Sequence, residues 1–232
     1  QFFSDVSHEL NTVLKLLSPT PNNLSQKGEY KDRYTLTSTY ASNEALNQYE
    51  FLGKLMGICI RTGVHLTLDL CSIVWRKIIN EKITEDDIFQ YDEGLYNMIN
   101  VLTKKDLTLE EFNEHFEGGL VLNDDNTSSN NVKECITYDS NMKLKLKYIN
   151  QVLTLKLTEC DIQINAIRKG LCSIIPVSLL KLITHNELEV LICGEKNVDI
   201  DLLKLNTNLS GDLTENSQNV KWLWEILREI TD

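Results

Sequence analysis

Apolar residues along this chain recur mainly at intervals of three and four, the spacing of an amphipathic helix. One such pattern ends at Gly63, and glycine there is typical of a helix C-terminus. A second helix is predicted over 70–78, where one apolar stripe runs around Trp75. Gly53 and Gly57 stand four apart on the first helix, so a neighbouring helix could approach it closely. The first helix carries Phe51, Leu52, Leu55, Met56 and Cys59 at this spacing.

Three further helix starts carry a capping-box pattern, in which a threonine precedes an acidic residue by three positions. Each threonine also follows an apolar residue and precedes another by four positions, as in a hydrophobic staple. The sequence therefore predicts that a helix begins just after each threonine. The pairs are Thr84 and Asp87, Thr108 and Glu111, and Thr184 and Glu187.

Strand patterns are few. Residues 119–122 and 135–138 flank a polar run and predict a β-hairpin with a long, mobile loop over 123–131. Residues 143–157 fit both a strand and a helix, and their length favours a helix. A last amphipathic stripe runs from Val220 to Ile230 after Ser217, a predicted N-cap. The predicted fold class is mostly α with small β-hairpins.

Charge narrows the possible partners. The 232 residues include 34 acidic and 23 basic side chains, a net charge of −11, which disfavours nucleic acid as a partner. The densest basic stretch, 143–147, is interpreted as a solvated face. No apolar run approaches the roughly 20 residues of a membrane span, and the first residues do not resemble a signal peptide. We expect a cytoplasmic protein, with the nucleus as a second compartment.

No catalytic or metal-binding motif emerges from the residues themselves. Phosphate-binding loops, dinucleotide fingerprints and zinc-protease motifs are absent, and the four histidines are isolated. The six cysteines stand far apart and are interpreted as reduced, mostly buried thiols. Cys172 follows Arg168, Lys169 and Gly170, a weak hint of activation, but isoleucines follow it and favour a core position. The sequence predicts no metal and no cofactor.

Several segments match, in order, the motifs of one known domain family. Residues 49–63 read YEFLGKLMGICIRTG, similar to the family's F-x-F-L-G-x-L-x-G-x-A-I-x-x-G helix. Residues 166–170, 174–176 and 187–194 read AIRKG, IIP and ELEVLICG, similar to F-R-x-G, I-P and E-L-E-x-L-I-C-G. KWLWEI at 221–226 and FFSDVSHEL at 2–10 resemble two further helices. Because the matches follow the family's order over nearly the whole chain, the chain resembles the HECT domain, the catalytic domain of one class of ubiquitin ligases. PTPN at 19–22 and IRTG at 60–63 point to the family's large HERC branch.

This resemblance implies a two-lobed enzyme. In the family, an N-terminal lobe binds a ubiquitin-charged conjugating enzyme (E2), and a C-terminal lobe accepts ubiquitin on a cysteine and transfers it to a substrate lysine. The chain resembles the N-terminal lobe, truncated at both ends, with no cysteine in the family's catalytic context. A large subdomain is expected over 1–82 and 158–232, and a small E2-binding subdomain over 83–157.

The resemblance also implies an apolar E2-binding groove. Its helix corresponds to residues 95–102, a neighbouring hairpin contributes near Phe116 and Leu120, and the next helix contributes Tyr148. Gly118 and Gly119 depart from the family's apolar residues at the hairpin. The four helix positions are spaced i, i+3, i+4 and i+7, which is independently compatible with one face. They are Leu95, Met98, Ile99 and Leu102.

The implied partners are an E2, ubiquitin, and a protein substrate bound by regions outside this chain. The implied function is that of an E2-docking lobe of a HECT-type ubiquitin ligase, inactive in transfer by itself. The alternative is a non-catalytic helical scaffold that uses a HECT-like fold for protein interaction only. This alternative predicts no E2 binding. Taken without the resemblance, Leu95, Ile99 and Leu102 are more simply interpreted as packing of the subdomain core.

Overall fold

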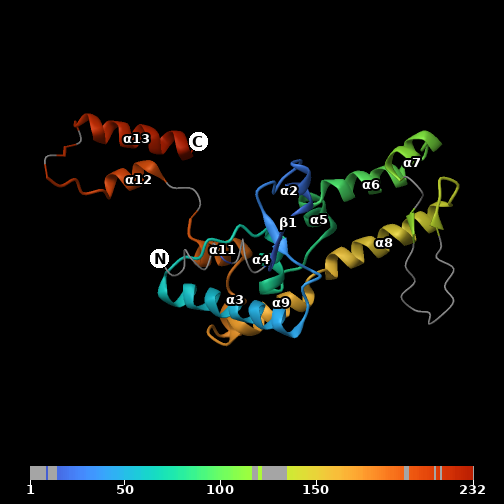
Figure 1. Cartoon of the computed structure of the whole chain (residues 1–232), viewed down its shortest axis with the longest axis horizontal. Coiled ribbons are helices and arrows are strands. Elements are labelled where there is room, and N and C mark those ends of the chain that lie inside the picture. Colours follow the sequence, from blue (N-terminus) through green and yellow to red (C-terminus); the bar gives the residue numbers. More distant parts are fainter. Residues whose placement is uncertain are drawn as a thin grey trace. The chain divides into compact units, whose positions relative to one another are not determined.

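A computed structural model of the chain describes residues 9, 15–116, 120–121, 135–195, 199–211, 213–214 and 216–231. Apart from Glu9, the helix predicted over 2–10 lies outside these residues, as does the predicted loop over 123–131. The chain forms two compact units, Gln1–Ile192 and Cys193–Asp232 (Figure 1). The described residues are mainly helical, which confirms the predicted fold class.

Two crossing helices form the centre of the first unit, α3 (Asn43–Thr62) and α9 (Asp161–Cys172) (Figure 1). Ser42 caps the start of α3, and Gly63 ends it with φ of 68°, as the sequence predicts. A Cβ atom on Gly53 would collide with the backbone of Ile167 on α9. The predicted close approach of a neighbouring helix is therefore confirmed.

A small sheet and two short helices pack beside this pair. Strands β1 (Leu17–Pro19) and β2 (Tyr34–Leu36) pair antiparallel, with Leu17 opposite Leu36, and helix α2 (Pro21–Ser25) lies between them in sequence. This sheet was not predicted, because each strand has only three residues. Tyr34 also bridges Leu70, so the following helix α4 begins at Ser72 (Ser72–Ile79), two residues after its predicted start.

The segment between α4 and α9 contains the predicted E2-binding subdomain. It comprises α5 (Glu85–Tyr91), α6 (Glu93–Thr103), α7 (Leu109–His115) and α8 (Met142–Thr158). Capping boxes at Thr84 and Thr108 begin α5 and α7, as predicted. Strands β3 (Leu120–Val121) and β4 (Cys135–Ile136) pair antiparallel and confirm the hairpin. The ambiguous segment 143–157 is helical, as its length indicated.

Two more helices follow α9, and then the second unit begins. Helix α10 spans Val177–Leu180, and α11 spans His185–Cys193, with Thr184 and Glu187 exchanging the predicted capping bonds. The second unit contains α12 (Ile200–Leu205) and α13 (Gln218–Thr231), which pack around Ile200, Val220 and Trp224. Helix α13 begins directly after Ser217, as predicted. Within the described residues, no helix is both long and apolar enough to span a membrane.

Candidate functional site in the 83–157 segment

Helix α6 is held at its N-terminus by local capping and by α8. The Asp92 carboxylate accepts a hydrogen bond from the backbone N–H of Leu95 at 3.0 Å. Lys156 of α8 lies 3.7 Å from the same carboxylate and 5.9 Å from the centre of the Tyr91 ring. These contacts fix the start of α6 against α8, so the groove positions on α6 are placed by a defined helix end.

The four predicted groove positions on α6 differ in depth. Leu95 is 7% exposed and Leu102 is fully buried, whereas Met98 and Ile99 are half-buried. All four lie on one helical face, but its ends point into the packing and its centre remains partly accessible. Leu95 and Leu102 therefore anchor the helix, and of these four side chains Met98 and Ile99 are the ones that a partner can reach.

The predicted hairpin contribution lies beside α7. The Phe116 side chain is buried, with its ring centre 5.1 Å from that of Phe112. The Phe112 ring in turn meets Tyr138 at 6.5 Å in an edge-on geometry. Leu120 is half-buried and pairs with Ile136 across the hairpin. Phe116 thus belongs to an aromatic cluster under the hairpin, and Leu120 is the more accessible of the two predicted residues.

Tyr148, the last predicted groove residue, lies on α8. Its side chain is half-buried, and this burial raises the pKa of the phenol above its ordinary value. Ile149 and Leu153 on the same helix are buried. Helices α7 and α8 both pack against α6. The structure therefore brings the elements that carry the seven predicted residues into one region of the first unit.

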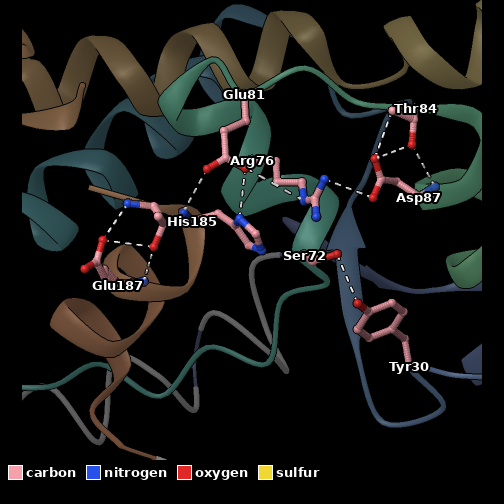
Figure 2. Close-up of polar contacts among 9 residues, drawn as sticks. Tyr30, Ser72, Arg76, Glu81, Thr84, Asp87, His185 and Glu187 are labelled. Atoms are coloured by element: carbon pink, nitrogen blue, oxygen red, sulfur yellow. Dashed lines mark hydrogen bonds and ion pairs between the residues drawn. The ribbon is translucent and has the colours of Figure 1, made fainter. Parts of the chain in front are cut away.

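A polar network joins α5 to α4 and α11 (Figure 2). Arg76 of α4 pairs with the Asp87 carboxylate at 3.0 Å, and Asp87 also accepts hydrogen bonds from the backbone N–H and hydroxyl of Thr84. On the other side of Arg76, Glu81 accepts a hydrogen bond from the backbone N–H of His185 and contacts its Nδ1 at 2.9 Å. The sequence predicted the Thr84 cap, but not the ion pair between Asp87 and Arg76 that joins α5 to α4.

A second polar contact in the same region ties the loop before β2 to α4. The Tyr30 hydroxyl donates a hydrogen bond to the Ser72 hydroxyl at 3.1 Å (Figure 2). Arg33, three residues later, pairs with Glu189 of α11 at 2.9 Å. No sequence pattern marks these partners, which lie far apart along the chain.

Three of the thiols are poor nucleophiles in the folded chain. Burial raises the pKa of Cys59 and of Cys71 to about 11, and that of Cys160 to about 12. A thiol with a raised pKa holds less of the thiolate that acts as nucleophile. Across the residues that the structure describes, no group of three histidine, cysteine, aspartate or glutamate side chains is arranged to hold a metal ion.

The fold and the region around α6 define the class: a mainly helical α+β domain with a small hairpin-containing segment between α4 and α9. A family model for the HECT domain, described as ubiquitin-transferase, matches residues 6–232. The chain belongs to the HECT-domain family.

Relatives in this family include several ubiquitin ligases. The chain is 28% identical over 235 residues to "E3 ubiquitin-protein ligase HERC2" of Mus musculus and to the protein of the same name from Homo sapiens. It is also 28% identical over 258 residues to "Probable E3 ubiquitin-protein ligase HECTD4" of Homo sapiens. Each alignment covers 99% of this chain but only 5% of the HERC2 proteins and 6% of HECTD4. The similarity confirms the HERC-like resemblance, and the chain corresponds to a small part of these long proteins.

Proposed function

We propose that this chain is the E2-docking lobe of a HECT-type ubiquitin ligase, with the small subdomain over 83–157 as the docking subdomain. The observation that carries the proposal is the family match over residues 6–232, which includes the α6 face of Leu95, Met98, Ile99 and Leu102. In the full-length protein, ubiquitin would pass from the E2 to a cysteine outside this chain and then to a substrate lysine. We expect this protein to act in the cytoplasm.

The accessibility of Met98 and Ile99 supports docking by an apolar contact. A partly exposed pair of flexible and branched side chains can receive an aromatic or aliphatic side chain from an E2 loop. Such a contact buries little area and exchanges quickly, which suits a carrier that must leave once it has discharged ubiquitin. Leu95 and Leu102 support it indirectly by fixing α6 in the subdomain.

A charge placed at the centre of this face tests the proposal. Ile99→Asp should abolish binding to a panel of free and ubiquitin-charged E2 enzymes, measured by biolayer interferometry with the 232-residue chain. The matched control is Asn100→Asp, the next residue on α6, which is exposed and receives the same charge. Equal binding by both variants and the unmodified chain would contradict the docking role of α6.

The α8 contribution is tested with a second matched pair. Tyr148→Ala should weaken E2 binding, whereas Leu146→Ala should not, because these two positions point in roughly opposite directions from the helix. Leu146 is 45% exposed, so its truncation should leave the fold intact. Leu102→Ala is not suitable for this purpose, because a fully buried leucine leaves a cavity that costs about 2–5 kcal/mol of stability.

Transfer itself is tested by incubating the 232-residue chain with ubiquitin-charged E2. We expect no reducible ubiquitin adduct on the chain, because none of its cysteines stands in the family's catalytic context and burial raises the pKa of the Cys59 and Cys71 thiols. A thioester on any of its cysteines would contradict the proposal that the acceptor lies elsewhere. E2 binding without an adduct is the result that agrees with a docking lobe.

A further inference from the structure

A hollow of about 340 Å³ lies where α2 and the loop after it meet α5 and α6. It belongs to the first unit and contains none of the seven predicted groove residues. Its walls combine acidic and aromatic side chains, which sets it apart from the apolar E2 groove. The lining residues are Asn22, Gly28, Glu29, Asp86, Phe89, Gln90, Glu93 and Tyr96.

A buried asparagine fixes the walls of this hollow in place. Asn22 is 1% exposed, and its amide nitrogen donates hydrogen bonds to the backbone carbonyls of Glu29 and Gln90, both at 2.9 Å. Its amide oxygen accepts a hydrogen bond from the backbone N–H of Glu93 at 2.8 Å. One side chain therefore joins the loop after α2 to the junction of α5 and α6, and a partner meets a preformed surface.

Three carboxylates line the hollow, those of Glu29, Asp86 and Glu93. Within the described part of the chain, no lysine, arginine or histidine pairs with Glu29, Asp86 or Glu93. The nearest charged network uses the neighbouring residue Asp87, which takes Arg76. The described residues also hold no group of acidic, histidine and cysteine side chains arranged for a metal ion, and the carboxylates are open to a cationic group from a partner.

Two aromatic rings beside the carboxylates provide a second feature that favours binding of a cation. The rings of Phe89 and Tyr96 are 5.2 Å apart at their centres and tilted by 56°. Tyr96 is 45% exposed, so part of its ring faces solvent beside the carboxylates. A cation over an aromatic face is stabilised by the negative charge of the ring face, and carboxylates nearby add to that attraction.

We propose that this hollow binds an arginine side chain presented by a protein partner. A guanidinium is planar, so it can stack on an aromatic ring while its N–H groups bind carboxylates at its edge. A lysine ammonium is a compact, strongly hydrated charge and meets only one of these two features well. The proposal does not rest on E2 docking, because it concerns another surface and another chemistry.

The probe is Nα-acetyl-arginine methylamide, titrated into the 232-residue chain and followed by amide NMR. We expect shifts at Phe89, Gln90, Glu93 and Tyr96, and binding at least about fivefold weaker for the uncharged citrulline analogue and for the lysine analogue. If the amide signals of these residues did not shift, the proposal would be overturned. Citrulline binding as tight as arginine would also overturn it, and equal lysine binding would overturn the preference for a guanidinium.

Variants test whether the arginine probe binds in the hollow. The double variant Glu29→Gln with Glu93→Gln should weaken arginine binding by about tenfold, because two charge-assisted contacts are lost. The matched control is Glu110→Gln with Glu114→Gln, which removes the same charge from exposed positions on α7. Tyr96→Leu should weaken binding by about threefold or more through loss of the ring. Equal weakening by the control pair would overturn the site, and unchanged amide spectra elsewhere would show that the variants remain folded.

Discussion

Gly53 of α3 and Gly170 of α9 each lie against the backbone of the other helix. A Cβ atom on Gly53 would strike the carbonyl of Ile167, and one on Gly170 would strike the carbonyl of Glu50. Because both obstacles are backbone, neither can move aside as a flexible side chain would. This mutual contact allows the two central helices to cross closely and sets the frame on which α4 and α8 are placed.

Adding one methyl group at this crossing should destabilise the domain. Gly53→Ala and Gly170→Ala should each lower the free energy of unfolding by at least about 2 kcal/mol, through overpacking against backbone. Urea denaturation followed by circular dichroism measures the change. The control is Gly94→Ala on α6, where the added atom meets only ordinary contact at 3.5 Å and helix propensity improves. Losses no larger than that of Gly94→Ala would contradict the close crossing.

The Arg76–Asp87 ion pair between α4 and α5 should contribute strongly to the stability of the fold. Asp87→Ala removes the carboxylate half of the α5 capping box and leaves the partly buried Arg76 without its closest carboxylate. We expect a loss of about 2–4 kcal/mol in the free energy of unfolding. Asp86→Ala is the control, because this neighbour is exposed and should change stability by no more than about 0.5 kcal/mol. Similar losses in the two variants would refute the assignment.

The cap of α11 should be visible in the titration of Glu187. Hydrogen bonds from the backbone N–H and then the hydroxyl of Thr184 lower the pKa of this carboxyl below its ordinary value. A lowered folded pKa means that the cap stabilises the fold above the unfolded pKa, and this contribution is lost as the pH falls through the folded pKa. Side-chain carboxyl NMR should show the low pKa.

Thr184→Ala separates the two bonds to Glu187. It removes the hydroxyl but keeps the backbone donor, which is the larger cause of the lowered pKa. We therefore expect the pKa of Glu187 to rise only part of the way to its ordinary value. A complete return, or no change at all, would show that the two donors do not share the carboxylate as described.

Thiol reactivity should separate the buried cysteines from the rest. Near about pH 7, a maleimide should leave Cys59 and Cys71 unmodified in the folded chain, because both are inaccessible and burial raises their pKa to about 11. Half-buried Cys172 should react faster. Peptide mass spectrometry gives the order, and labelling in urea provides the control in which all sites react. Early modification of Cys59 or Cys71 would be inconsistent with their burial.

The two tryptophans of α13 should contribute very differently to the packing of the second unit. Trp224 is 8% exposed in the small core with Ile200 and Val220, whereas Trp222 is 53% exposed. Trp224→Ala should speed hydrogen exchange of the α12 amides by about tenfold or more, because α12 loses its main packing partner. Trp222→Ala should leave those amides nearly unchanged. Equal protection in both variants would show that this core does not hold α12.

Local patterns were predictable because their partners are close in sequence. Thr84, Thr108 and Thr184 each meet an acidic residue three positions away, and these bonds form as soon as the first helical turn does. The C-cap at Gly63 and the helical state of 143–157 follow from equally local rules. By contrast, the β1–β2 pair and the contacts of Arg76 and Asn22 join segments whose spacing carries no pattern.

The candidate E2 site likewise combines features that the sequence predicts with features that only the packing decides. Periodicity placed Leu95, Met98, Ile99 and Leu102 on one helical face, and family resemblance associated that face with E2 binding. Periodicity gives the direction of a side chain but not its depth, since depth depends on what packs over it. Helices α7 and α8 pack against α6, Leu95 and Leu102 are buried, and Met98 and Ile99 stay partly accessible.

The amino-acid sequence alone determined the helical class, several helix ends and the HECT resemblance, because each depends on residues near one another or on their order. Only the tertiary structure decided which groove residues a partner can reach, and it alone assembled the acidic, aromatic hollow beside Asn22. Those features arise from residues as far apart as Asn22 and Glu93, whose meeting is set by the packing of whole helices.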